Sequence, residues 1–215
     1  MSPALEVELK LRAETDAPLL ALTAADRLGP LELGAPTDVA EVDRYLDTAD
    51  GRLAQAGWAC RLRSRQGRTR ISLKGPPQVG TTGALHRRPE VEGPANDEVD
   101  PARWPPSAAL ERLLALSGRA PLVEWLVLDQ LRTERAATLA DVPAGTLSLD
   151  RVRVLRDDVE RGRFLVVELE MDGRALDQGL DPEALLSALK ATPGLQVEPQ
   201  TKLERALALL GMGTA

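Results

Sequence analysis

Charged and apolar residues alternate strictly over residues 5–11, and this pattern constrains the fold more than any other stretch of the chain. The segment reads LEVELKL, so one face of an extended chain carries Glu6, Glu8 and Lys10 while the other carries only leucine and valine. Successive side chains leave a strand on opposite faces, so the pattern predicts a β-strand. A single strand of this kind is typical of a half-exposed sheet with its charges in water.

The same alternation recurs along the chain. Further strands are predicted over residues 42–48, 58–65, 68–74, 85–92, 126–139, 146–150 and 164–171. Helices are predicted over 16–28, 107–117, 182–192 and 202–210, with a short segment at 53–55 and a loop over 75–83. Short glycine-containing loops such as Gln66-Gly67 predict hairpins, and no β–α–β crossover pattern recurs. The strands should therefore be antiparallel.

The polar faces of these strands carry both signs of charge on strand after strand. They hold Glu6, Glu8, Lys10, Arg12, Arg61, Arg63, Arg65, Arg70, Lys74, Arg88, Glu90, Glu92, Arg132, Asp150, Glu168 and Glu170. A face that only meets water would carry more Thr, Ser and Gln. Closing about eight strands into a barrel removes both sheet edges and encloses a space for one small ligand. The sequence thus predicts an α+β fold, a closed eight-stranded antiparallel β-barrel with a charged interior and helices packed outside.

The composition restricts the classes of ligand and the cellular compartment that we expect for this protein. The net charge of −6 argues against general nucleic-acid binding. No apolar run approaches the ~20 residues of a membrane span, and the first residues do not read as a signal peptide. The single cysteine, Cys60, fits a reducing compartment. We expect a cytoplasmic protein with no nucleic-acid or membrane partner; a homodimer is left open.

A charged interior of this composition suits one kind of ligand. Clustered Arg and Lys recognise phosphate groups. Clustered carboxylates, without cysteine ligands and with a single histidine, suit Mg²⁺ or Mn²⁺. Together they describe a metal-bound polyphosphate, whose hydrolysis depends mainly on positioning and charge stabilisation.

Several motifs resemble those of a known family. Glu6-Val7-Glu8-Leu9-Lys10 is similar to the ExExK signature of the CYTH domain, also called the triphosphate tunnel metalloenzymes. Further segments resemble this family in the right order: Tyr45–Asp50, Arg61–Arg63, Leu73-Lys74, Leu149-Asp150, Glu168–Glu170 and Thr201–Arg205. Leu85–Glu90 looks closest to the bacterial inorganic triphosphatases. The resemblance covers roughly residues 4 to 206, so residues 1–215 are expected to form a single CYTH domain.

The resemblance implies roles for individual residues and one or two divalent ions, Mg²⁺ or Mn²⁺. Metal ligands would be Glu6, Glu8, Glu168 and Glu170, with Asp150, Glu90 and Glu92 near or supporting them. Phosphates would be held by Lys10, Arg61, Arg63, Lys74, Arg88, Arg132 and Lys202. The catalytic set would be Glu6, Glu8, Lys10, Glu168 and Glu170, converting tripolyphosphate to pyrophosphate and phosphate.

Other functions stay open within and outside this family. The same fold houses thiamine triphosphatases, nucleoside triphosphatases and adenylate cyclases, and no aromatic cluster offers a pocket for an organic group. A non-catalytic polyphosphate-binding module would need chiefly the basic residues, whereas this chain has the acidic set as well.

The sequence departs from the family pattern at three points. Arg151-Val152-Arg153 stands where the family often has glycine, and Thr201 replaces a frequent serine. A CHAD domain that often follows is missing from this sequence, so the domain either stands alone or is cut from a longer protein. His86 is expected at the rim of the tunnel, Cys60 in the core, and Arg65 at a tunnel mouth.

Overall fold

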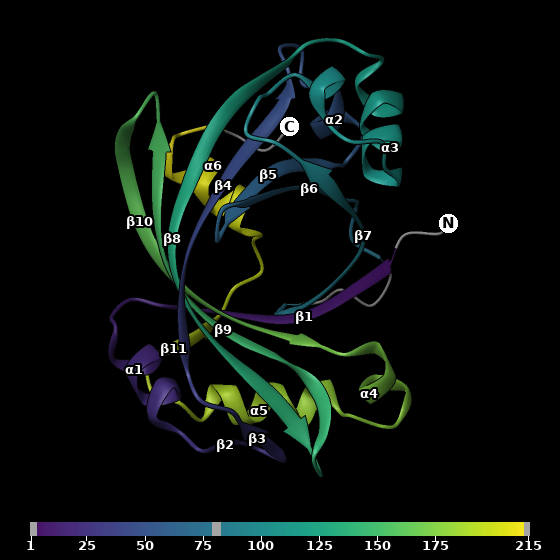
Figure 1. Cartoon of the computed structure of the whole chain (residues 1–215). Helices are drawn as coiled ribbons and strands as arrows, with labels where there is room; N and C mark the ends of the chain where they lie inside the picture. The colour runs from purple at the N-terminus through teal and green to yellow at the C-terminus, as the bar shows by residue number, and fades with distance from the viewer. Residues whose placement is uncertain (1–3, 79–82, 213–215) are drawn as a thin grey trace.

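The fold is a closed antiparallel β-barrel, seen in a computed structural model that describes residues 4–78 and 83–212. Eight strands form the ring, in the order β4 (Thr37–Thr48), β5 (Ala59–Arg65), β6 (Arg68–Lys74), β7 (Leu85–Ala95), β1 (Ala4–Ala13), β10 (Val159–Met171), β9 (Val142–Arg156) and β8 (Leu122–Leu139). Pairing of β8 with both β9 and β4 closes the ring (Figure 1). The predicted eight-stranded antiparallel barrel is confirmed.

Shorter elements extend and cover this ring. They are the strands β2 (Arg27–Leu28), β3 (Leu31–Leu33) and β11 (Leu195–Val197), the helices α1 (Ala17–Ala24), α2 (Arg52–Gln55), α3 (Ala108–Ser117), α4 (Gly173–Asp177), α5 (Pro182–Lys190) and α6 (Lys202–Leu209), and a 3₁₀ turn at Pro101–Arg103. Strands β2 and β3 extend the sheet beside β8, and β11 pairs with the end of β1. In Figure 1, α1 and α5 lie below the ring while α2 and α3 lie above it.

The opening strand places its charges inside the barrel and its apolar residues outside. Leu9 and Leu11 are buried in a cluster with Leu19 of α1 and Leu185 of α5. A second outer cluster joins β5 and β6 to α3 through Leu62, Ile71 and Leu113, among others. Helices therefore supply the cover that the apolar strand faces need, and the polar faces are left to line the interior.

Helix α6 packs differently from the other helices. Its Ala206 and Leu207 contact Leu128, Val154 and Phe164 among others, side chains that share the inward face of their strands with the charged residues. The helix begins with a capping box in which Thr201 accepts a hydrogen bond from the backbone N–H of Glu204 and the Glu204 carboxylate accepts one from that of Thr201. This helix fills one end of the barrel and brings its first residue, Lys202, to the interior.

Several predicted boundaries were wrong. Helix α1 ends at Ala24 instead of residue 28, and β4 begins at Thr37 instead of residue 42. Strand β9 continues to Arg156, so Arg151–Arg153 lie within it and the turn falls at Asp157 and Asp158, where φ is 52° and 59°. The loop predicted over 75–83 includes residues 79–82, which lie outside the described residues.

A buried arginine ties β8 to the outer elements and gives a test of the fold. Arg135 donates to the carbonyl oxygens of Leu22, Leu33 and Gly34, at 2.8, 3.0 and 2.7 Å. Arg135→Leu should lower the free energy of unfolding by about 2 kcal/mol, because these donors are lost from a buried site. Urea unfolding measures this, with the exposed Arg103→Leu as control; a loss no larger than that of the control would contradict the structural role.

Candidate functional site

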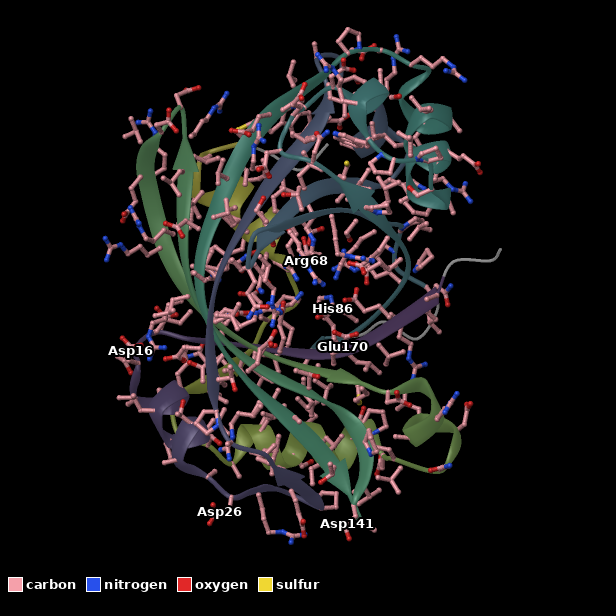
Figure 2. The ribbon with its side chains drawn as sticks, in the orientation of Figure 1. Asp16, Asp26, Arg68, His86, Asp141 and Glu170 are labelled. Atoms are coloured by element: carbon pink, nitrogen blue, oxygen red, sulfur yellow. The ribbon has the colours of Figure 1, made fainter. Side chains whose placement is uncertain are left out.

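A cavity of about 200 Å³ lies inside the barrel. It is lined by Glu6, Glu8, Lys10, Tyr45, Ala59, Arg61, Arg63, Ser72, Lys74, Arg88, Glu90, Glu92, Arg132, Ser148, Glu168, Glu170, Thr201, Lys202 and Leu203. Every predicted catalytic and phosphate-binding residue is in this lining, as is every predicted metal ligand except Asp150, which lies buried behind it. Figure 2 shows Glu170 on the β1–β10 side of the barrel, with His86 above it.

Four of the six carboxylates that line the cavity lie on two neighbouring strands, and the other two, Glu90 and Glu92, lie on β7. Strand β1 carries Glu6 and Glu8, and the adjacent β10 carries Glu168 and Glu170. Glu8 stands directly opposite Glu170 in the register, a like-charge pair that destabilises a sheet. Positive charge must offset this repulsion. Some of these carboxylates have a lysine or arginine of the chain beside them, and others do not.

Lys10 supplies counter-charge at the centre of the acidic wall. Its ammonium group lies 2.8 Å from Glu8 and 3.3 Å from Glu168, and its side chain is only 3% exposed. Although burial opposes it, the neighbouring carboxylates raise the pKa of Lys10. Burial also opposes ionisation of Glu8, yet Lys10 lowers the pKa of Glu8 to about 2. This pair is therefore fully charged at neutral pH.

Asp150 and Glu168 are also paired with cations. Asp150 accepts hydrogen bonds from Arg132, at 2.6 and 2.9 Å, and from Lys202, at 2.6 Å. Lys202 lies 2.8 Å from Glu168, and Arg132 lies 3.3 Å from it. Against the cost of burial, Lys202, Lys10 and Arg132 together hold the pKa of Glu168 well below its usual value. Asp150 thus positions two cations that face the cavity.

Glu6 and Glu170 keep unused capacity for a ligand. Glu6 pairs with Lys74 through one oxygen, while its Oε2 is buried without a hydrogen-bond partner. Within the described part of the chain no cation lies within 4 Å of Glu170. Withdrawal from water and the nearby Glu6, Glu90 and Glu8 raise the pKa of Glu170 to about 7, and burial likewise raises that of Glu6.

These two carboxylates, with the neighbouring Glu8, fit a hard divalent cation. Such an ion takes carboxylate oxygens and would offset their mutual repulsion. Among residues 4–78 and 83–212 no three acidic or histidine side chains are already arranged as a metal-binding cluster. The metal-ligand roles of Glu6, Glu8, Glu90, Glu92, Asp150, Glu168 and Glu170 accordingly stay predictions.

Most basic side chains of the cavity come from β5, β6 and β7, of which β7 lies directly beside β1. Arg61 and Arg63 project from β5, Lys74 from β6, and Arg88 from β7. Arg88 lies 3.9 Å from its nearest carboxylate, Glu8, and its Nε is buried without a hydrogen-bond partner in the described residues. The Nε of Arg61 is likewise buried without a hydrogen-bond partner among the described residues. Both arginines therefore retain donors that an anionic ligand can take up.

Two buried carboxylates beside Arg61 and Arg63 were missed by the sequence interpretation. Asp43 accepts hydrogen bonds from both Arg61 and Arg63, and Glu41 pairs with Arg63 at 2.7 Å. Although burial opposes it, the two arginines hold the pKa of Asp43 well below its usual value. The alternation of β4 runs through both carboxylates; the predicted strand over 42–48 contains Asp43 but begins one residue after Glu41. Their role is to position the arginines.

Three other predicted residues lie in different surroundings. His86 is buried, not at the rim, and its Nε2 lies 3.0 Å from the carbonyl oxygen of Glu198. Burial lowers the pKa of the His86 imidazole, and the positive charge of the nearby Lys10 lowers it further. Arg65 forms a two-pronged ion pair with Glu134 at the edge of the cavity. Glu92 pairs with Arg70 at 3.2 Å, and its side chain is 41% exposed. Cys60 is buried in the outer core, as predicted.

The raised pKa of Glu170 predicts a pH effect on the metal-free protein. Between pH 4.5, the ordinary pKa of a glutamate carboxyl group, and about pH 7, the folded state keeps a proton that the unfolded state has lost. Stability should therefore fall as pH rises through this window. Glu170→Gln should remove that part of the fall and be the more stable protein at pH 8, as urea unfolding at both ends of the window would measure. If the difference in unfolding free energy between the wild-type protein and the variant did not change with pH, the raised pKa of Glu170 would be contradicted.

A closed antiparallel barrel with carboxylates and basic side chains lining its interior defines a tunnel protein. The chain belongs to the CYTH domain family, which it matches over residues 4–207, and it has the triphosphate tunnel fold. Members of this family typically use divalent metals. No helix of the described residues is long and apolar enough to cross a membrane.

Solved structures agree with this assignment. A candidate adenylyl cyclase from Hippeastrum, described as having a dominant triphosphatase activity, is 20% identical with a TM-score of 0.66, covering 96% of each chain. A candidate adenylate cyclase from Bacillus halodurans is 17% identical with a TM-score of 0.63, covering 95% of this chain and 98% of the other. The PH1819 protein from Pyrococcus horikoshii is 19% identical with a TM-score of 0.56, covering 94% and 98%. At such identities the likeness establishes the fold alone. No curated protein matches the chain by sequence.

Proposed function

We propose that this protein hydrolyses inorganic tripolyphosphate to pyrophosphate and phosphate, with a divalent metal, inside the barrel. The observation that carries the proposal is one cavity lined by both kinds of charge: four carboxylates from β1 and β10, and Arg61, Arg63, Lys74 and Arg88 from β5 to β7. A linear triphosphate has the charge to satisfy these basic side chains, and the carboxylates have the spare oxygens for a cation. The bacterial inorganic triphosphatases are the branch that we infer for this chain, with a cytoplasmic location.

The residues of the chain would divide the work by their positions. Arg61, Arg63 and Arg88 bind the phosphate oxygens, and Arg132 and Lys202, fixed by Asp150, bind from the far side. Glu6, Glu8 and Glu170 would hold the divalent ion. Such an ion, when bound, neutralises phosphate charge and favours attack by water on phosphorus. Water forms the new P–O bond, and the anhydride bond to the leaving pyrophosphate breaks.

The lining of the cavity favours an inorganic substrate over an organic triphosphate. Tyr45 is the one aromatic side chain among the described lining residues. Bases and thiazole or pyrimidine rings are commonly held by stacking on aromatic side chains, and a single tyrosine offers little surface for this. The names of the solved relatives make ATP the alternative substrate, as a triphosphatase or cyclase substrate.

Phosphate release decides between these functions. The wild-type protein is supplied with tripolyphosphate, ATP, thiamine triphosphate or long-chain polyphosphate, each with Mg²⁺ or Mn²⁺, and cyclic AMP is measured in the ATP reactions. We expect the highest kcat/KM for tripolyphosphate and no activity in EDTA. Binding of tripolyphosphate without turnover of any compound would make the protein a binding module and refute the enzyme.

A further inference from the structure

The β5–β6 hairpin continues the row of basic side chains beyond the cavity. On its inward face the register places four cross-strand rungs in line: Ala59 opposite Lys74, Arg61 opposite Ser72, Arg63 opposite Arg70, and Arg65 opposite Arg68. At two residues a rung, these span about 20 Å. The cavity lining includes residues of the first three rungs, while Arg65, Arg68 and Arg70 lie outside it.

The outer rungs carry repulsion that the fold does not fully relieve. Arg63 faces Arg70 and Arg65 faces Arg68, and like charges directly opposite one another destabilise a sheet. Arg63 is neutralised by Glu41 and Asp43, and Arg65 by Glu134. Among the basic residues of these four rungs, Arg68 is then the one that no acidic residue of the described chain pairs with.

The two remaining arginines are placed to meet a ligand that leaves the cavity. Arg70 is 53% exposed and has one partner, Glu92, at 3.2 Å. Arg68 is exposed, and no carboxylate of residues 4–78 and 83–212 pairs with it. Figure 2 labels Arg68 above His86 and Glu170, on the β5–β6 side of the barrel. Arg63, Arg70 and Arg68 therefore mark a path from the cavity to the tip of the hairpin.

We propose that Arg70 and Arg68 form an extension of the anion site, which binds the distal phosphates of a linear inorganic polyphosphate longer than three phosphates. Such a chain repeats its negative charge at every phosphorus, so its distal phosphates can follow the cations out of the cavity. Helix α6 fills one end of the barrel through Ala206 and Leu207, so the chain extends toward the hairpin. This inference rests on the proposed function, because it assumes phosphates inside the cavity.

Binding measured without turnover tests the extension. Titration calorimetry in EDTA compares tripolyphosphate with a long-chain linear polyphosphate, counted per chain, for the wild-type protein, Arg68→Ala and the Arg68→Ala/Arg70→Ala double variant. The matched control is Arg161→Ala, an exposed arginine on β10. We expect tighter binding of the longer chain by the wild-type protein. Each hairpin substitution should weaken it about fivefold and leave tripolyphosphate binding unchanged.

Three results would overturn the extension. They are equal affinity of the wild-type protein for both lengths, an equal loss for both ligands in the Arg68→Ala variant, and tighter binding of a 5′-triphosphorylated oligonucleotide than of polyphosphate. The phosphate-release assay separates this inference from the proposed function. Length-dependent binding without release refutes only the hydrolase, whereas release with length-independent binding refutes only the extension.

Discussion

Glu8→Gln is expected to lower metal-dependent phosphate release from tripolyphosphate by about 100-fold while the barrel stays folded. Glu8 lies at the centre of the acidic wall, with Lys10 at 2.8 Å and Glu170 opposite it in the register. Glutamine keeps the size of the side chain but removes the negative charge that a divalent cation requires. Lys10 retains Glu168 at 3.3 Å, so its charge does not become uncompensated.

The substitution separates a metal ligand from a structural carboxylate by its response to metal. If Glu8 holds the ion, the concentration of Mg²⁺ needed for half-maximal activity should rise, and high Mg²⁺ should restore part of the rate. The matched control is Glu124→Gln, which removes a carboxylate paired with Arg44 on the outside of the barrel. Activity of Glu8→Gln equal to that of the control would refute the assignment. Equal activity loss at every Mg²⁺ concentration would show that Glu8 acts on something other than the metal.

The inversion of the strand faces could be predicted from the sequence because it repeats. The pattern of Glu6, Glu8 and Lys10 alone fits any exposed strand, but opposite charges on strand after strand indicate a shared interior. The structure confirms this, since Lys10 is buried among carboxylates while Leu9 and Leu11 pack under helices. Local alternation identifies each strand because it depends only on the period of a strand, and its repetition in several strands indicates which face is enclosed.

The pairing partners could not be predicted, because they depend on register and strand order. Asp43 meets Arg61 and Arg63 only because β4 pairs with β5 in one particular alignment. Closure through β8, which pairs with β4 and β9, is equally non-local. Leu131 shows the same limit. It lies on the apolar face of the strand predicted over 126–139, yet it is 46% exposed on the outer face of β8, where it lines a groove with residues such as Ala40 and Leu165.

Substitution of Asp150, the carboxylate that β9 places inside the barrel, has the largest expected effect on stability. Asp150→Ala should lower the free energy of unfolding by about 4 kcal/mol, because it leaves the buried cations Arg132 and Lys202 without their carboxylate. Asp150 is fully buried and accepts three hydrogen bonds from these two residues. Urea unfolding of the metal-free protein measures the loss.

The same two strands provide a matched control on the outside of the barrel. Asp129 of β8 pairs with Arg153 of β9 at 2.8 Å, with side chains 40% and 48% exposed. Asp129→Ala should cost less than about 1 kcal/mol, because an exposed ion pair gains little over hydration. Similar losses for Asp129→Ala and Asp150→Ala would contradict the view that burial makes the inner carboxylate decisive.

Tripolyphosphate should restore part of the stability that Asp150→Ala loses. The substitution leaves Arg132 and Lys202 facing the cavity with Glu168 as their remaining shared carboxylate. A bound polyanion supplies the missing negative charge, so the melting temperature should rise more with tripolyphosphate in the variant than in the wild-type protein. An equal rise in both would place the bound phosphates away from these cations, whereas a larger rise in the variant locates them at the Asp150 side of the cavity.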